Sequence, residues 1–145
     1  MASTQENLKQ IYETDYYQWL IETAEQLRSH QFKELDWENL LAEIEDVGKT
    51  EKRALRSNLR ILLMHLLKLT YQPEKATRSW NLTIVEHRKR IQDTLQESPS
   101  LKPYFYEIFE TCYQDAIELA VAETGLSPTT FPENCPSPID TVLND

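Results

Sequence analysis

The sequence predicts an all-α protein, a single-domain antiparallel bundle of four to five helices around one long central helix. The 145 residues include only two glycines and are rich in Leu, Glu, Gln, Lys, Arg and Ala, which favour helix. No window alternates apolar and polar residues between turn signals, so we expect no strand. A chain of 17.1 kDa can bury roughly two thirds of its unfolded surface in one core.

The first helix is expected from about Asp15 to Ser29, with Thr14 as its N-cap. Its apolar residues recur at i, i+3, i+7 and i+10, the spacing of a stripe that faces a core. This stripe consists of Tyr17, Leu20, Ala24 and Leu27. Residues 1–13 either extend this helix or fray.

A long central helix is expected to begin at Trp37, after the N-cap residue Asp36. Gly48 interrupts its apolar stripe, but no proline forces a stop, so we favour one helix over 37–71, with two helices as the alternative. Residues 61–69 are apolar on nearly every side, which predicts that the rest of the fold encloses them. The stripe contains Trp37, Leu40, Leu41, Ile44 and Val47, and resumes with Leu55, Leu59, Leu62, Leu66 and Leu69.

Two more long helices should follow. Pro73 ends the central helix, and the next helix is expected from about Ser79 to Gln96. Its core face contains Trp80, Ile84, His87, Ile91 and Leu95. The last long helix should begin near Pro103, with a core face of Phe105, Ile108, Phe109, Cys112, Ala116, Leu119 and Ala120.

The C-terminal segment differs in composition from the helices. Gly125 stands where a left-handed residue caps a helix. Four prolines in residues 127–138 predict an extended tail, 127–145, that packs on the bundle. Phe131 and Cys135 are its expected anchors, and Ser137 with Pro138 can open a short closing helix through Leu143.

The net charge of −9 is distributed unevenly. Residues 1–50 carry 11 acids and 4 bases, residues 51–90 carry 3 acids and 10 bases, and residues 91–145 carry 10 acids and 1 base. We expect helices of opposite charge to complement each other within the fold. The alternative is that the basic middle faces an acidic partner. The negative overall field makes nucleic acid an unfavoured partner.

Two histidines are the first candidates for a functional site. His65 lies inside the apolar run, in line with Asn58 and Glu51 at seven-residue intervals. His87 lies on the apolar face of the next helix at a similar height, so antiparallel packing would bring the two imidazoles together. With a carboxylate such as Glu43 or Glu86 they could hold a metal, although no metal-ligand motif is present. The simpler interpretation is a pair of hydrogen-bonded histidines at the edge of the core.

A basic face is the third candidate. Arg53, Arg56 and Arg60 share one helical face by the i, i+3, i+7 rule. Lys52 and the run 88–90 add to the basic set, and nucleic-acid binding through it is one alternative function. A solvated or ion-paired face is the simpler interpretation, and no aromatic residues interleave to stack bases.

Several chemistries have no signal in the sequence. Two scattered glycines cannot form a phosphate-binding loop, and no nucleophile–base spacing marks a hydrolase, so no catalytic residue, metal or cofactor is assigned. Cys112 and Cys135 are 23 residues apart without a CxxC pair, and we expect free thiols. With no apolar leader after Met1 and no run near the ~20 residues of a membrane span, we expect a cytoplasmic protein.

An ordered set of short motifs resembles one protein family. The set covers roughly residues 12–145 and is highly specific. Its members are Asp36-Trp37-Glu38-Asn39-Leu40, Glu43-Ile44-Glu45 with Gly48-Lys49, Leu62-Leu63-Met64-His65-Leu66-Leu67-Lys68, Tyr71-Gln72-Pro73, Arg78-Ser79-Trp80, Pro99-Ser100-Leu101, Glu123-Thr124-Gly125-Leu126 and Phe131-Pro132-Glu133-Asn134-Cys135-Pro136. Together they resemble the bacterial, chiefly cyanobacterial family catalogued as domain of unknown function 29.

This resemblance implies a small all-helical protein and supplies no activity, cofactor or partner. The motifs make His65, Tyr71, Arg78 and Trp80, together with His87, the preferred positions for any site. The expected function is a non-enzymatic module that binds a protein partner or a second copy of itself. A metal-binding or enzymatic site around His65 and His87 is the alternative.

Overall fold

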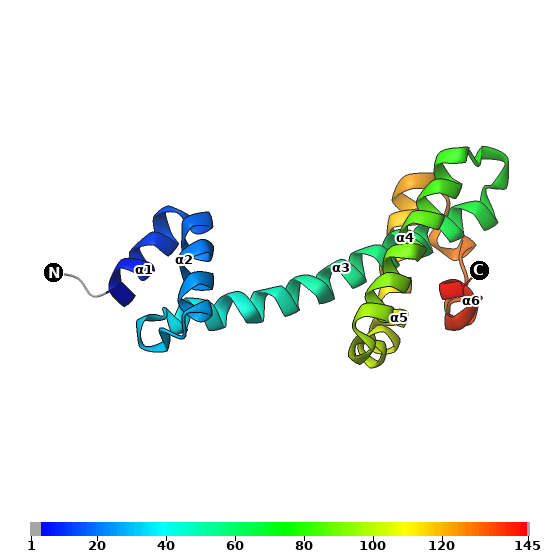
Figure 1. Cartoon of the computed structure of the whole chain (residues 1–145). Coiled ribbons are helices and arrows are strands. Elements are labelled where there is room, and N and C mark those ends of the chain that lie inside the picture. Colours follow the sequence, from blue (N-terminus) through cyan, green and yellow to red (C-terminus); the bar gives the residue numbers. More distant parts are fainter. Residues whose placement is uncertain (1–3, 145) are drawn as a thin grey trace. The chain divides into compact units, whose positions relative to one another are not determined.

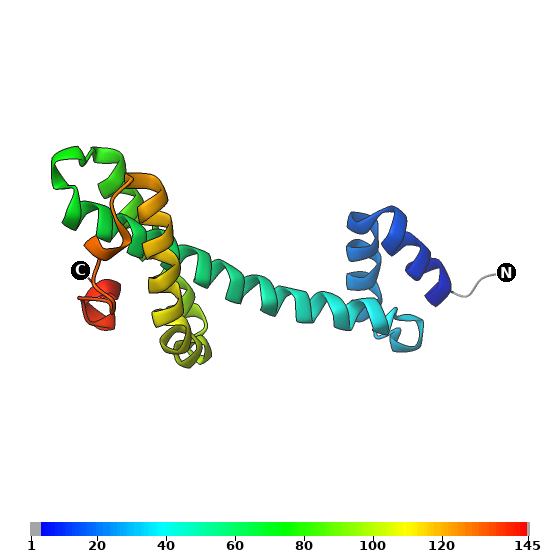
Figure 2. The same cartoon turned by 180° about the vertical axis from the view of Figure 1, so that it is seen from behind.

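The computed structural model describes residues 4–144, and the all-α prediction is confirmed. Six α-helices lie in this range: α1 (Thr4–Thr14), α2 (Tyr16–Arg28), α3 (Trp37–Tyr71), α4 (Arg78–Glu97), α5 (Lys102–Thr124) and α6 (Ile139–Asn144). Four 3-10 turns connect them, at Phe32–Glu34, Pro73–Lys75, Pro99–Leu101 and Pro128–Thr130. The elements appear in Figure 1 and, from behind, in Figure 2.

The chain divides into two compact units, 1–50 and 51–145, called here the N-terminal and the C-terminal unit. The boundary falls within α3, which is continuous from Trp37 to Tyr71. The prediction of one helix through Gly48 is therefore confirmed. That the two units behave as one domain stays a prediction.

The N-terminal unit contains a short helix that the sequence left open. Residues before Thr14 form α1, which packs against α2. Asp15 separates the two helices and its carboxylate accepts a hydrogen bond from the Gln18 backbone N–H at 3.0 Å. The predicted cap at Thr14 is wrong, because Thr14 is still helical and Asp15 satisfies the exposed N–H groups of α2.

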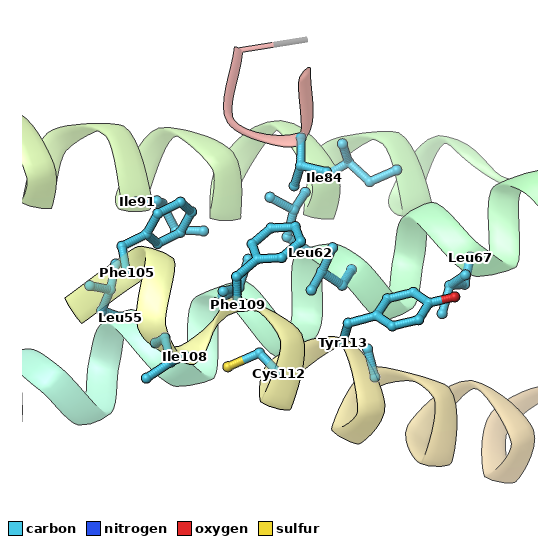
Figure 3. Packing of buried hydrophobic residues seen from close by; sticks show 14 of the residues in the cluster. Leu55, Leu62, Leu67, Ile84, Ile91, Phe105, Ile108, Phe109, Cys112 and Tyr113 are labelled. Carbon is cyan, nitrogen blue, oxygen red and sulfur yellow. The ribbon is translucent and has the colours of Figure 1, made fainter. Parts of the chain in front are cut away.

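The C-terminal unit holds the main hydrophobic core. Figure 3 shows α3, α4 and α5 meeting over aliphatic and aromatic side chains, with Leu62 of α3 among Ile84 of α4 and Phe109 of α5. Leu55, Leu59 and Leu62 are fully buried, and Leu66 and Leu69 pack against the cluster while partly exposed. The prediction that later segments enclose this part of α3 is confirmed.

The ends of α5 and the tail follow from local chemistry. Gly125 caps α5 with φ of +74°, which glycine adopts without strain. Phe131 is buried and its ring meets that of Tyr71 edge to face at 5.3 Å. The Tyr113 hydroxyl, in the core, donates to the Pro132 carbonyl at 2.7 Å. One predicted core residue of α5 is wrong: Leu119 is 41% exposed.

Candidate functional site

A buried lysine is the centre of a polar cluster in the C-terminal unit. The Lys68 side chain on α3 is only 5% exposed. Its Nζ lies 3.3 Å from Glu123 Oε1 on α5 and 4.3 Å from the centroid of the Trp80 ring on α4. The cation is thus matched by a carboxylate and by the electron-rich face of an indole, which offsets part of its desolvation.

His65 lies one turn before Lys68 on α3. Its Nδ1 is 3.1 Å from the Ile61 carbonyl, which can only accept, so Nδ1 carries the hydrogen. Burial lowers the pKa of His65, and the positive charge of Lys68 lowers it further. The imidazole is therefore neutral at pH 7, with Nε2 free of hydrogen.

His87 on α4 is held in a similar way. Its Nδ1 lies 2.8 Å from Asn58 Oδ1 on α3, an acceptor, so the ring again donates from Nδ1. Burial lowers the pKa of His87, and the charge of Arg90 lowers it further while that of Glu86 opposes this. Asn58, which the sequence placed in line with His65, therefore orients the other histidine.

These two imidazoles and Lys68 are the reactive groups of the cluster, and they come from α3 and α4. Neutral imidazoles with free Nε2 atoms can accept protons or bind metals. Among residues 4–144, however, no three His, Cys, Asp or Glu side chains are grouped so that they could hold a metal ion. The Lys68 ammonium is already paired with Glu123 and Trp80. The cluster is therefore largely satisfied by its own members.

Sequence reasoning identified only part of this cluster. It named His65, His87 and Trp80 but missed Lys68 and Glu123. A lysine inside the apolar run 61–69 was a usable signal, because a buried ammonium needs an anionic partner. Its partner Glu123 is 55 residues away and had no such signal.

The other predicted positions have separate surroundings. Tyr71 packs against Phe131 and holds the tail, whereas Arg78 is exposed in the first turn of α4. The preferred positions therefore do not form one site: Tyr71 makes a core contact and Arg78 lies on a helix surface, whereas the other three belong to the polar cluster around Lys68.

The basic face is partly engaged by α5. Arg56 donates from Nη2 to the Tyr104 hydroxyl at 2.9 Å, and Arg60 Nε lies 3.8 Å from Asp115 Oδ2. Arg53 is exposed. The basic part of α3 and the acidic α5 therefore complement each other, as the charge distribution predicted.

In the N-terminal unit, one carboxylate joins three helices. The hydroxyls of Tyr12 on α1 and Tyr16 on α2 donate to the two oxygens of Glu43 on α3, each at 2.6 Å. These bonds lower the pKa of Glu43, and the bond to Glu43 raises the pKa of Tyr12 to about 12. Nearby, Asp36 is fully buried and accepts from the Trp19 indole at 3.4 Å. One side of α3 is thereby fixed to α1 and α2.

A neighbouring side of α3 is bare. We call Trp37, Leu41, Ile44 and Val47 the α3 stripe; their side chains are 52%, 58%, 62% and 63% exposed. The prediction that these residues face a core is wrong, because in the N-terminal unit α1 and α2 pack on the Glu43 side instead. The Trp37 indole donates to the Phe32 carbonyl at 3.1 Å, which fixes the ring.

Helix α2 also exposes its predicted core face. Tyr17, Leu20, Ala24 and Leu27 are all exposed. The buried residues are Trp19, Thr23 and Gln26, about a third of a turn away. Thr23 Oγ1 and Gln26 Oε1 are buried without a hydrogen-bond partner. This helix therefore buries polar atoms and leaves apolar side chains in solvent.

Comparison with known proteins gives a family and no activity. Among residues 4–144, every helix is too short or too polar to cross a lipid bilayer. Neither the curated proteins nor the solved structures include a match to this chain. A family model matches residues 11–145, nearly the whole chain. The protein therefore belongs to the family described as Domain of unknown function DUF29.

Proposed function

We propose that this protein is a cytoplasmic, non-enzymatic module that binds another protein chain, and that the α3 stripe is its contact surface. One observation carries the proposal: four large apolar side chains follow one another along a helix, and each is more than half exposed. Contiguous exposed apolar patches of this kind mark interaction sites in proteins that do not aggregate.

The composition of the stripe supports a specific contact. Trp37 is the residue type most enriched at binding hot spots, and its ring is already fixed by the bond to Phe32. A fixed anchor loses little side-chain entropy on binding. Burial of an exposed leucine or isoleucine contributes about 1.5–3 kcal/mol before the cost of association.

The N-terminal unit supports the proposal as a whole. Its exposed apolar residues extend beyond the stripe to Tyr17, Leu20 and Ile21 on α2. The same unit buries the unpaired polar atoms of Thr23 and Gln26. A unit that exposes apolar side chains and buries polar ones gains stability when a partner covers it.

The C-terminal unit offers less support for an enzymatic or nucleic-acid function. Lys68, the most buried base, is paired with Glu123. Arg56 and Arg60 are engaged by α5. A site that acts on a substrate needs groups directed at that substrate, and here Lys68, Arg56 and Arg60 are directed at groups of α5.

Site-specific photocrosslinking tests the proposal. A benzophenone amino acid replaces Leu41 in the full chain, and a matched control carries it at Leu119, which is also exposed but lies on α5. We expect one discrete crosslinked protein band from position 41 and none from position 119. If position 41 gives only the background seen at 119, the stripe is not a contact surface and the proposal is wrong.

A further inference from the structure

The outer face of α4 is an exposed apolar surface in the C-terminal unit. Leu82 and Val85 are 68% and 49% exposed, and they are three residues apart on the side of α4 opposite Ile84 and Ile91. By helical spacing, Arg78 and Lys89 continue the same line at its two ends. We call Arg78, Leu82, Val85 and Lys89 the α4 outer face.

The α3 stripe and the α4 outer face carry opposite charges. Between residues 37 and 47 there are four acids, Glu38, Glu43, Glu45 and Asp46, and no base. Glu38 and Glu45 border the stripe by helical spacing, and both are exposed. The two ends of the α4 outer face are basic, and both Arg78 and Lys89 are exposed.

We propose that the chain which covers the α3 stripe is a second copy of this protein, and that it does so with its α4 outer face. The inference rests on the proposed function and names the partner. Each copy has one stripe and one outer face, so the contact is head-to-tail, with different surfaces of the two copies in contact.

The dimensions of the two surfaces agree. Arg78 and Lys89 are about 16 Å apart along α4, and Glu38 and Glu45 are about 10 Å apart along α3, at a rise of 1.5 Å per residue. If Leu82 and Val85 pack on Leu41 and Ile44, each base therefore lies within reach of an acid beside the stripe. Long lysine and arginine side chains span the remaining difference.

Charge argues against two stripes packing on each other. That contact would place Glu38 and Glu45 of one copy beside the same two acids of the other, and like charges brought together at an interface oppose binding. It would also leave Leu82 and Val85 exposed. The head-to-tail contact covers the α3 stripe and the α4 outer face and pairs acids with bases.

A mixing experiment tests the proposal with two full-length variants. Leu41→Asp disables the stripe, and Leu82→Asp disables the outer face; both positions are more than half exposed, so folding should be unaffected, as circular dichroism verifies. We expect the unmodified protein to associate as concentration rises in light scattering, and each variant alone to be monomeric. An equimolar mixture should form a 1:1 pair, because one intact stripe meets one intact outer face.

Leu119→Asp is the matched control, since it adds the same charge at an exposed leucine outside both surfaces; it should associate as the unmodified protein does. A monomeric unmodified protein at all concentrations overturns the inference. Association of Leu82→Asp at the unmodified strength overturns it too, since stripe-to-stripe contact would then hold the copies together. In either case a crosslink from position 41 to another protein still supports the proposed function.

Charge reversal gives a second, independent measurement. Glu45→Lys and Lys89→Glu should each raise the dissociation constant about tenfold or more, which corresponds to about 1.4 kcal/mol. A chain that carries both substitutions has a reversed stripe and a reversed outer face, so opposite charges again lie across the contact between two copies. This double variant should recover association. Equal weakening without recovery in the double variant would contradict the proposed pairing of surfaces.

Discussion

The two units use their apolar residues in opposite ways. Among the described residues, the N-terminal unit buries three apolar side chains, Leu8, Trp19 and Leu35, and exposes ten large ones. The C-terminal unit buries seventeen and exposes four. The C-terminal unit therefore contains most of the hydrophobic core, whereas the N-terminal unit combines a few buried apolar side chains with aromatic contacts and polar bonds.

The polar bonds of the N-terminal unit explain how it is ordered with so little core. Glu43 accepts from two tyrosines, and Asp36 accepts from Trp19 and from the Asn39 side chain at 2.6 Å. Such bonds specify geometry but add little net stability, because each replaces a hydrogen bond to water. An apolar surface is thereby held in position without being covered, which is what a preorganised binding surface requires.

The largest expected effect is the difference in stability loss when a leucine is shortened in the C-terminal unit and in the N-terminal unit. Leu62→Ala should lower the free energy of unfolding by about 2–5 kcal/mol, because it leaves a cavity in the C-terminal core. Leu41→Ala, the same change in the N-terminal unit, should alter it by less than about 0.5 kcal/mol, because the side chain is exposed. Urea denaturation followed by circular dichroism, at a concentration where the protein is monomeric, measures both. Equal losses would mean that the stripe is buried after all.

Replacement of a buried polar residue should destabilise the N-terminal unit alone. Asp36→Ala removes the N-cap of α3 and leaves the buried Trp19 indole without its acceptor, at a cost of about 1–3 kcal/mol. Hydrogen exchange resolved by peptide should show faster exchange over α1 and α2 and unchanged exchange over α5. Faster exchange throughout the chain would show that the two units unfold together.

The features that sequence predicted are those that depend on neighbours along the chain. The scarcity of glycine, the position of Pro73 and the left-handed cap at Gly125 gave the helices and most of their ends. Continuity through Gly48 followed from the absence of a proline. The alignment of Asn58 with His65 gave a polar line, although Asn58 bonds to His87 rather than to His65.

The wrong predictions concern which apolar helix faces are covered by other helices. Periodicity shows that Trp37, Leu41 and Ile44 share a face with Leu55, but not that another helix covers only the later part. On α2 the spacing selected the stripe through Tyr17, whereas the single large residue Trp19 decided which side packs inward. Whether an apolar face is a core or a contact surface depends on tertiary packing, which periodicity does not contain.

Alanine substitutions at the two glycines should change the free energy of unfolding by intermediate amounts and in opposite directions. Gly48→Ala should stabilise by up to about 1 kcal/mol, since Gly48 is helical and an added Cβ meets nothing within 4 Å. Gly125→Ala should destabilise by about 1–2 kcal/mol, because φ is +74° there. Thermal unfolding of both variants checks the pair. Destabilisation by Gly48→Ala would show that the helix between the units needs a glycine.

The smallest effect is a pH dependence that starts in the C-terminal unit. Burial lowers the pKa values of His65 and His87; around His87, Arg90 and His65 act in the same direction, while Glu86 opposes them. Below the ordinary histidine pKa of about 6.5, the unfolded chain therefore binds more protons than the folded one. The stability of this unit should fall as pH is lowered through that value.

The N-terminal unit should respond at lower pH. The bonds from Tyr12 and Tyr16 lower the pKa of Glu43, so its contribution is complete above the ordinary glutamate pKa of about 4.3 and is lost as pH falls through the lowered value. Between about pH 7.5 and 5.5, only the C-terminal unit should therefore lose protection against hydrogen exchange through this mechanism, with each exchange rate compared with the intrinsic rate at the same pH. His87→Gln keeps a donor for Asn58 and removes one titrating group. It should therefore reduce the loss of protection in the C-terminal unit as pH falls, and leave protection in α1 and α2 unchanged. An unaltered loss of protection would mean that burial of His87 does not set the acid response of the core.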